Sequence, residues 1–283
     1  MTQPLNQPVN HPLHVIRPSG SRWFPDLAEL WQFRDLCVAL GRRDVTLRYR
    51  QTILGIVWVL LQPLIAGGVF AVIFGKVAGL KTGTATSYFL FAYAGFVGWS
   101  AFQSALTRAA GSVLGQGNLV TKVFFPRLVL PISAIFSSLI DFIVAMAALL
   151  VWFGITGTPL GPALLTLPLW AFLLFAMGLG LGTVAAALSV RFRDVQHALP
   201  VLVQLLLYAS PVAYATSVVP DHIRRWFVLN PLAGALDGFR WAVLGADPPS
   251  GLSIAVAIAG TALSLLAGAV IFARFERQLA DVI

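Results

Sequence analysis

The sequence has little charge. Asp, Glu, Lys and Arg make up 11% of its 283 residues, whereas hydrophobic residues make up 58%. A soluble domain typically carries about 25% charged residues. There are too few polar side chains to cover a water-soluble globule, so the composition predicts an all-α polytopic membrane protein.

Acidic residues are scarcer than basic ones. The chain has 11 Asp and Glu residues against 19 Lys and Arg residues, which gives a net charge of +8. Such an excess can indicate nucleic-acid binding. Here, however, the basic residues lie in short connections between apolar runs instead of on one face of a soluble domain. We therefore expect a membrane protein that binds membrane lipid and no nucleic acid.

Residues suited to catalysis or metal binding are also few. Cys37 is the only cysteine, so no internal disulfide can form. The four histidines lie far apart and lack metal-ligand spacing: His11, His14, His197 and His222. The sequence has no G-x-S-x-G motif and no loop with paired carboxylates. We therefore expect no catalytic residue, no metal and no cofactor in this chain.

Long apolar runs are what the sequence does contain. A hydrocarbon core of ~30 Å needs about 20 apolar residues per helix. By this rule we expect about six transmembrane helices, at Ile53–Phe74, Ser87–Leu106, Leu128–Phe153, Leu164–Ser189, Leu199–Ser217 and Leu252–Ala273. Gly178 and Gly182, four residues apart in the fourth of these, suit close helix packing.

The positions of Lys and Arg predict the orientation of the spans. One side of the membrane would carry only Lys76, Lys81, Arg224, Arg225 and Arg240, whereas the other side would carry all the remaining Lys and Arg residues. Because Lys and Arg are retained on the cytoplasmic side, both termini are expected to be cytoplasmic.

The chain divides into three predicted parts. Residues 1–25 are rich in proline and are expected to form a disordered tail. Residues 26–52 are expected to form a cytoplasmic amphipathic interface helix, Asp26–Leu40, which ends at Gly41 and is followed by a linker. This helix either lies in the membrane interface or packs on a partner protein. Residues 53–283 form the transmembrane domain.

The connection between the fifth and sixth spans carries helix signals. Pro220 and Asp221 can start a short helix that runs through Leu229. Asn230 followed by Pro231 is a typical helix start, with an N-cap residue and a first-turn proline, and Gly245 is a typical stop. We expect two short outer helices here that re-enter or lie on the outer leaflet.

Some polar residues within the spans can be interpreted in two ways. Asp141, the only acidic residue inside a span, either carries protons or bonds to Ser137, Ser138 or another span. The aromatic residues mostly suit the membrane interface. Gln204, Tyr208 and Tyr214 better suit the lining of a path, because polar groups are costly against lipid.

A set of short motifs extends through the chain. They comprise Arg43-Asp44 with Tyr49, Leu54-Gly55, Trp58 and Pro63; Asn118-Leu119-Val120 with Lys122 and Phe125-Pro126-Arg127; Arg191, Arg193 and Asp194 with Ser210-Pro211 and Tyr214; and Asn230-Pro231-Leu232 with Arg240. In their order and spacing they resemble the membrane subunit of ABC-2 type exporters, in the branch that exports lipid-linked polysaccharides such as O-antigen, capsule or wall teichoic acid.

The resemblance implies a mechanism and partners. The chain would be half of a homodimer in the bacterial inner membrane, with two separate ATPase subunits that bind the ATP and magnesium. The dimer would form a continuous channel for a polysaccharide linked to undecaprenyl or another lipid.

The resemblance also implies roles for individual residues. The ATPase-coupling segment would comprise Asn118, Lys122, Phe125, Pro126 and Arg127; the lipid-phosphate contacts Arg43, Arg48 and Arg50; the channel lining Trp58, Gln62, Gln204, Tyr208 and Tyr214; and the outer gate Asn230, Pro231 and Arg240. Arginine suits phosphate because its guanidinium binds two oxygens at once. The same arginines also fit a purely topological role on the inner face.

Three other functions remain open from the sequence. The chain could be an ABC-2 exporter of a drug or small lipid, a membrane-embedded glycosyl- or acyltransferase, or a proton-coupled transporter based on Asp141. An associated ATPase would favour the exporters, and detectable transferase activity in the isolated chain would favour the transferase. Unchanged transport in Asp141→Asn would eliminate the proton-coupled transporter.

Overall fold

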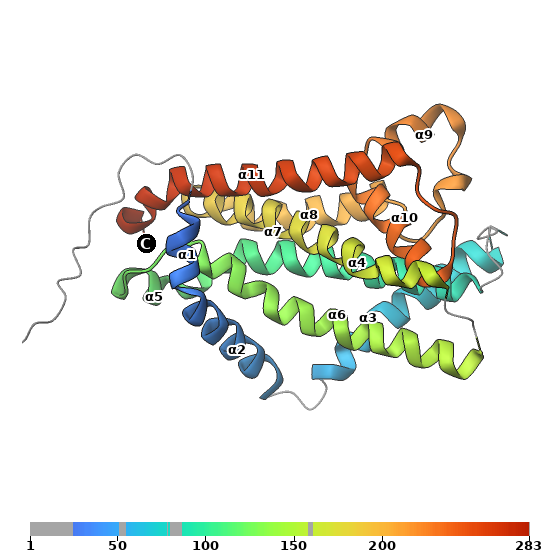
Figure 1. Cartoon of the computed structure of the whole chain (residues 1–283), viewed down its shortest axis with the longest axis horizontal. Coiled ribbons are helices and arrows are strands. Elements are labelled where there is room, and N and C mark those ends of the chain that lie inside the picture. The colour runs from blue at the N-terminus through green and yellow to red at the C-terminus, as the bar shows by residue number, and fades with distance from the viewer. Residues whose placement is uncertain (1–24, 51–54, 78, 80–86, 158–160, 283) are drawn as a thin grey trace, which may run out of the picture.

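The computed structural model describes residues 25–50, 55–77, 79, 87–157 and 161–282, and in these ranges the protein consists of helices without a strand (Figure 1). The predicted all-α membrane fold is confirmed. Residues 1–24 of the predicted disordered tail lie outside the described ranges, as do residues 51 and 52 of the predicted linker.

Two helices replace the single amphipathic helix that we predicted at the N-terminus. Helix α1 is Leu27–Gln32, with Asp26 as its N-cap, and α2 is Arg34–Arg50. The predicted end at Gly41 is wrong, because α2 continues for more than two further turns. Gly41 is instead a packing position: a Cβ atom there would lie 2.6 Å from the Phe136 ring. The apolar side of these helices packs on an inner cluster that includes Leu40, Phe125 and Phe272.

Within the described ranges, five helical segments are long and apolar enough to cross a membrane. They are Val57–Val77 (α3, Gly55–Phe70, with the π-helix η1, Ala71–Val77), Tyr88–Gly111 (α4), Val129–Thr156 (α6), Pro162–Arg191 (the 3-10 helix η3, Pro162–Thr166, with α7, Leu167–Arg191) and Gly251–Phe275 (within α11, Gly251–Val282). Each overlaps a predicted span. Except for Val57–Val77, these segments are longer than the predicted apolar runs, because the helices continue beyond the ends of those runs.

The predicted fifth span differs from the others. Helix α8, Asp194–Ala209, has 16 residues and ends well before the predicted boundary at Ser217. The reason is Pro211, which disfavours helical backbone at the residue before it, and Ser210 is indeed extended. At about 1.5 Å per residue, α8 is shorter than the ~30 Å hydrocarbon core. A sixth crossing therefore stays a prediction.

Small residues allow the central helices to touch backbone to backbone. A Cβ atom added to Gly178 of α7 would lie 2.6 Å from the carbonyl oxygen of Phe102 on α4, and one added to Gly182 would lie 2.5 Å from that of Leu106. On the other side of α7, a Cβ atom on Gly268 of α11 would lie 2.7 Å from the Gly180 carbonyl oxygen. The predicted role of these glycines in helix packing is confirmed.

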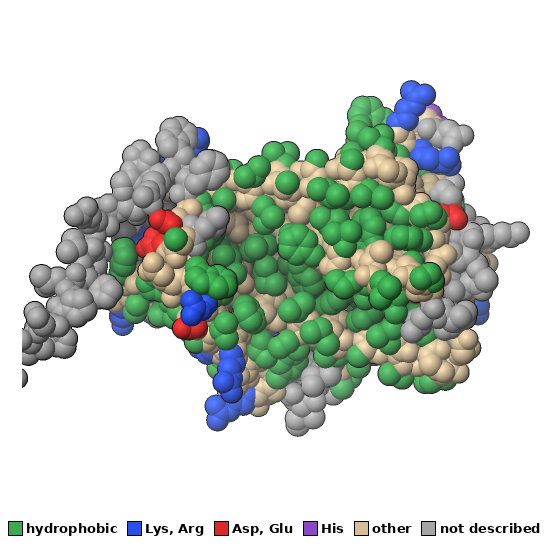
Figure 2. Space-filling view, in the orientation of Figure 1, with side chains coloured by type: hydrophobic (Ala, Val, Ile, Leu, Met, Phe, Trp, Pro, Cys, Tyr) green, Lys and Arg blue, Asp and Glu red, His purple; other side chains and the backbone are tan. Residues whose placement is uncertain are grey.

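The long helices lie side by side and leave short helices at the two ends of the bundle (Figure 1). At one end, which we call the α5 end, lie α1, the 3-10 helix η2 (Leu114–Gln116), α5 (Gly117–Lys122) and the last turns of α11. At the other, the α9 end, lie α9 (Asp221–Val228) and α10 (Pro231–Leu244), preceded by the 3-10 helix η4 (Thr216–Val218). Hydrophobic side chains cover much of the flank between the ends (Figure 2).

Candidate functional site

The segment between α4 and α6, which contains the predicted coupling residues, forms a short helix at the α5 end. Helix α5 begins at Gly117, and Lys122 at its end is exposed. The backbone of Asn118 lies in α5, while its side chain lies outside the described residues. Pro126 and Arg127 are half-buried where the chain turns into α6. The predicted coupling residues therefore lie on one short segment, which projects from the α5 end.

Two adjacent phenylalanines in this segment have opposite environments. Phe125 is 4% exposed and packs in the inner cluster with Val129 and Phe272. Phe124 is 65% exposed, and Val123 beside it is exposed as well. Phe125 thus anchors the segment to the bundle, whereas a partner protein would meet Phe124. The motif in the sequence includes Phe125 and not Phe124, and it does not reveal which of the two residues faces outward.

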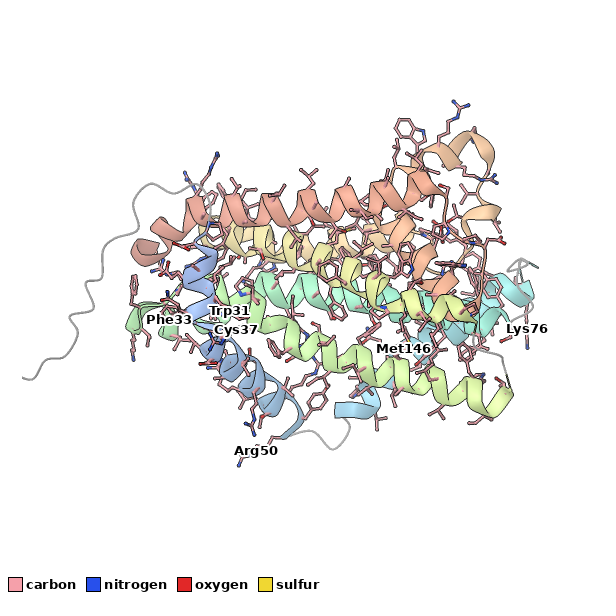
Figure 3. All side chains as sticks on the ribbon, viewed as in Figure 1. Trp31, Phe33, Cys37, Arg50, Lys76 and Met146 are labelled. Atoms are coloured by element: carbon pink, nitrogen blue, oxygen red, sulfur yellow. The ribbon has the colours of Figure 1, made fainter. Side chains whose placement is uncertain are left out.

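The three arginines predicted to contact a lipid phosphate do not converge. Arg43 pairs with Asp44, with Nη2 and Oδ1 3.0 Å apart. Arg48 pairs with Asp141 on α6, with Nη2 and Oδ2 3.0 Å apart. Arg50 is exposed at the C-terminal end of α2 and points away from the bundle (Figure 3). Arg50 is therefore the best placed of the three to meet a ligand.

Asp141 forms a polar cluster with three side chains from two other helices. Its Oδ2 is 3.0 Å from Arg48 Nη2 and 2.9 Å from Arg108 Nη2, and its Oδ1 accepts a hydrogen bond from the Tyr49 hydroxyl. Arg48 and Tyr49 come from α2, and Arg108 from the last turn of α4. Burial, and then the hydrogen bond to Asp141, raise the pKa of Tyr49 to about 12, so the hydroxyl remains a donor at neutral pH.

The expected partners of Asp141 are only partly right. A bond to Ser137 or Ser138 was one expectation; Ser138 Oγ has no hydrogen-bond partner in the described chain. The other expectation, a partner on another span, is confirmed by Arg108. From the sequence, Arg108 is predicted only to lie on the cytoplasmic side. A lone acid within a span requires a cation, but Arg127 is nearer to Asp141 along the chain than Arg108 is, so the sequence does not single out Arg108.

Four of the predicted path-lining residues lie on the exposed faces of two helices. Trp58 and Gln62 are exposed on α3, and Gln204 and Tyr208 are exposed on α8. Both helices contact α4. Tyr214 is different: it is half-buried after the end of α8, and its hydroxyl donates a hydrogen bond to the Tyr208 carbonyl oxygen at 3.1 Å. The exposed glutamines place uncovered polar amides among largely apolar neighbours, which is costly against lipid.

The predicted outer gate residues organise the start and the interior of α10. The Asn230 side chain accepts from the Leu232 amide at 3.0 Å, as an N-cap should, and Pro231 occupies the first turn. The Asn230 amide group also donates to the Ala209 carbonyl oxygen at the end of α8 and to Ser210 Oγ, both at 3.2 Å. Asn230 therefore holds the start of α10 against the end of α8.

Arg240 lies inside the α9 end and holds α10 to the chain that follows α8. Its Nη1 donates to the Tyr214 carbonyl oxygen at 3.2 Å and lies 3.8 Å from Asp237 Oδ1. Asp237 accepts a hydrogen bond from the Thr216 hydroxyl at 2.6 Å. Arg240 is thus a buried cation with a carboxylate beside it, and it ties three segments together. Helices α9 and α10 begin and end close to their predicted bounds.

These features define an all-helical, multi-span membrane protein that carries an exposed short helix at one end and a pair of packed short helices at the other. The chain belongs to the ABC-2 type transporter family, whose profile matches residues 35–244.

Three relatives show which proteins the chain is similar to. It is 30% identical over 222 residues to the O-antigen export system permease protein RfbA of Myxococcus xanthus, covering 75% of this chain and 81% of that protein. It is 26% identical over 211 residues to RfbA of Klebsiella pneumoniae, covering 73% and 79%. It is 25% identical over 252 residues to the polysialic acid transport protein KpsM of Escherichia coli, covering 85% and 93%.

Proposed function

We propose that this chain is the membrane subunit of an ATP-driven exporter that moves a lipid-linked polysaccharide from the cytoplasmic to the outer face of the bacterial inner membrane. The similarity to an O-antigen export permease over most of both chains carries this proposal. The similarity to a polysialic acid transport protein supports the same substrate class. The chain itself would hydrolyse no ATP and would bind no cofactor.

The distribution of charge supports a cytoplasmic location for the α5 end. Among the described residues, this end carries Lys122 of α5 and Arg127 after it, together with Arg191 at the end of α7 and Arg193 just before α8. Lys and Arg are retained on the cytoplasmic side of membrane proteins. With this orientation both termini are cytoplasmic and α9 lies on the outer side.

The α5 segment is the surface on which we place the ATPase. Lys122, Val123 and Phe124 are exposed on it, and Phe125 fixes it to the bundle. An exposed aromatic beside a cation suits a protein groove, since aromatic residues dominate interface energetics. Two ATPase subunits would bind the two α5 segments of a homodimer.

The exposed faces of α3 and α8 suit the path for the polysaccharide. They carry Trp58, Gln62, Gln204 and Tyr208, which are costly or wasteful against lipid. In a homodimer they would face a shared path, where amides hydrogen-bond sugar hydroxyls and aromatic rings stack on their C–H faces. Tyr214 would act from behind this face by fixing Tyr208.

Reconstitution tests the proposed function. The full chain is co-expressed with an ABC ATPase subunit from the same organism, purified and placed in proteoliposomes that contain a labelled lipid-linked polysaccharide. We expect the ATPase to co-purify and ATP to drive the glycan across the membrane. Transport of a drug or a small lipid instead of the glycan would overturn the assigned substrate. Glycan transport by the chain without any ATPase would overturn the proposal as a whole.

A further inference from the structure

Helix α2 is tied to the rest of the bundle by two polar contacts that lie close together along it. The first joins Asp44 Oδ2 to the Gln116 side-chain amide, with nitrogen and oxygen 3.5 Å apart. The second joins Arg48 and Tyr49 to Asp141. Between these contacts and the start of the helix, α2 packs closely on α6 through Gly41.

The first contact reaches the coupling segment directly. Gln116 is the last residue of η2, and α5 begins at the next residue, Gly117. A displacement of α5 therefore moves the side chain that bonds to Asp44. Arg108, at the end of α4, belongs to the same continuous stretch of chain and carries the displacement to Asp141.

The second contact depends on a single carboxylate. Two guanidinium groups contact Oδ2 of Asp141: Nη2 of Arg48 lies 3.0 Å from it, and Nη2 of Arg108 lies 2.9 Å from it. The two cations belong to α2 and α4, and the Asp141 carboxylate is the negative charge between them. Two like charges this close repel each other, so without the carboxylate the same arginines would push the helices apart.

A cavity beside the cluster gives these side chains room to rearrange. Its volume is about 380 Å³, and its lining includes Asp44, Arg108 and Gln116. Arg108 Nε and Gln116 Oε1 are buried without a hydrogen-bond partner in the described parts of the chain. Groups left unsatisfied in this way favour an alternative arrangement in which they are bonded.

We propose that Asp141 is a positioning residue for transport: it is the joint through which movement of the η2–α5 segment is passed to α2, and from α2 to the path-lining helix α3. This inference rests on the proposed function, because it requires an ATPase that moves α5. In this proposal Asp141 transmits a movement between helices and does not carry protons. Arg48 and Arg108 are its partners in that role.

Labelling of one cysteine on α2 measures the movement. The reporter is Leu47→Cys in a Cys37→Ser background, since Leu47 is exposed on α2 and lines the cavity. The complex with its ATPase is treated with a maleimide, with and without ATP. We expect ATP to change the labelling rate at least about fivefold, the lower range of typical coupling between sites. In Asp141→Asn we expect the rate to be unaffected by ATP and glycan export to fall by at least the same factor.

Two further variants make the result interpretable. Asp141→Asn leaves Arg48 and Arg108 close together without the carboxylate that they share, so the double variant Arg108→Gln with Asp141→Asn removes the joint with less repulsion and serves if the single variant does not fold. Arg42→Gln, at an exposed position six residues before Arg48 on the same helix, is the matched control and should retain the ATP response.

The outcomes separate the two proposals. If the unmodified background binds no ATPase and shows no ATP response, the proposed function fails, and this inference fails with it. If the background responds to ATP and the double variant responds equally, the proposed function stands and the inference is overturned. Loss of the response in both Asp141 variants, with Arg42→Gln unaffected and the ATPase still bound, supports the joint.

Discussion

The guanidinium carbon of Arg240 lies 4.4 Å from the centre of the Phe91 ring, at a position where the arginine side chain is 2% exposed. The ring belongs to α4 and the cation to α10. Arg240 Nε and Nη2 have no hydrogen-bond partner in the described chain, so the ring face is what covers them. A cation over an aromatic face is stabilised by about 2 kcal/mol or more once both are removed from water.

Replacement of Arg240 by alanine should destabilise the protein severely. It removes the stacking on Phe91 and leaves the half-buried Asp237 with no cation beside it, and breaking a buried pair costs up to about 3–5 kcal/mol. We expect a large fall in the midpoint of thermal unfolding in detergent. Arg240→Lys keeps the charge without the planar group and should cost less. Arg225→Ala, at an exposed position on α9, is the control, and an equal effect from both alanine variants would contradict this account.

The close contact of α7 with α4 yields a second stability prediction. Gly178→Ala puts a Cβ atom 2.6 Å from the Phe102 carbonyl oxygen, which cannot move without its helix. Overpacking of this kind costs about 1–3 kcal/mol. Gly154 of α6 lies in open space, so Gly154→Ala should stabilise its helix by about 0.5–1 kcal/mol. Unfolding midpoints that shift in the same direction for both variants would refute the role of Gly178 in packing.

The helix positions could be predicted from the sequence because their signals are local. An apolar run, an N-cap such as Asn230 and a stop such as Gly245 each act through neighbouring residues, and the structure has the corresponding helices. The error at Gly41 has a non-local cause. Whether a glycine ends a helix or packs inside it depends on what lies opposite, here Phe136 of α6, which the local sequence does not reveal.

The candidate site was less predictable for the same reason. Three arginines on α2 look equivalent along the sequence, but Arg43 and Arg48 have carboxylate partners and Arg50 points away. The pairing of Arg48 and Arg108 with Asp141 joins three helices and depends on how they cross. Which of two adjacent phenylalanines is buried likewise depends on the packing of the inner cluster.

The two phenylalanines of the coupling segment should separate stability from partner binding. Phe125→Ala empties a buried position and should lower the free energy of unfolding by about 3–5 kcal/mol. Phe124→Ala removes an exposed side chain and should leave the unfolding midpoint nearly unchanged, yet weaken binding of the ATPase by about tenfold or more, since buried interface aromatics often contribute over 2 kcal/mol. Thermal unfolding of the chain alone and a titration with the purified ATPase measure the two effects. Unimpaired ATPase binding by Phe124→Ala would exclude this surface as the docking site.

Arg50 is the arginine of α2 best placed to meet a lipid phosphate, because it is exposed and points away from the bundle. A basic side chain near an anionic membrane surface contributes about 1 kcal/mol, so Arg50→Gln should weaken binding of a polyprenyl phosphate in nanodiscs by roughly fivefold. Arg34→Gln, at an exposed position in the first turn of the same helix, is the matched control. Since exposed charges are screened, the difference between the two variants should shrink as salt rises to about 1 M, where the Debye length is only about 3 Å. If both variants bind the polyprenyl phosphate with equal affinity at low salt, Arg50 contributes only to the orientation of the chain in the membrane. In that case α2 does not take part in recognition of the lipid.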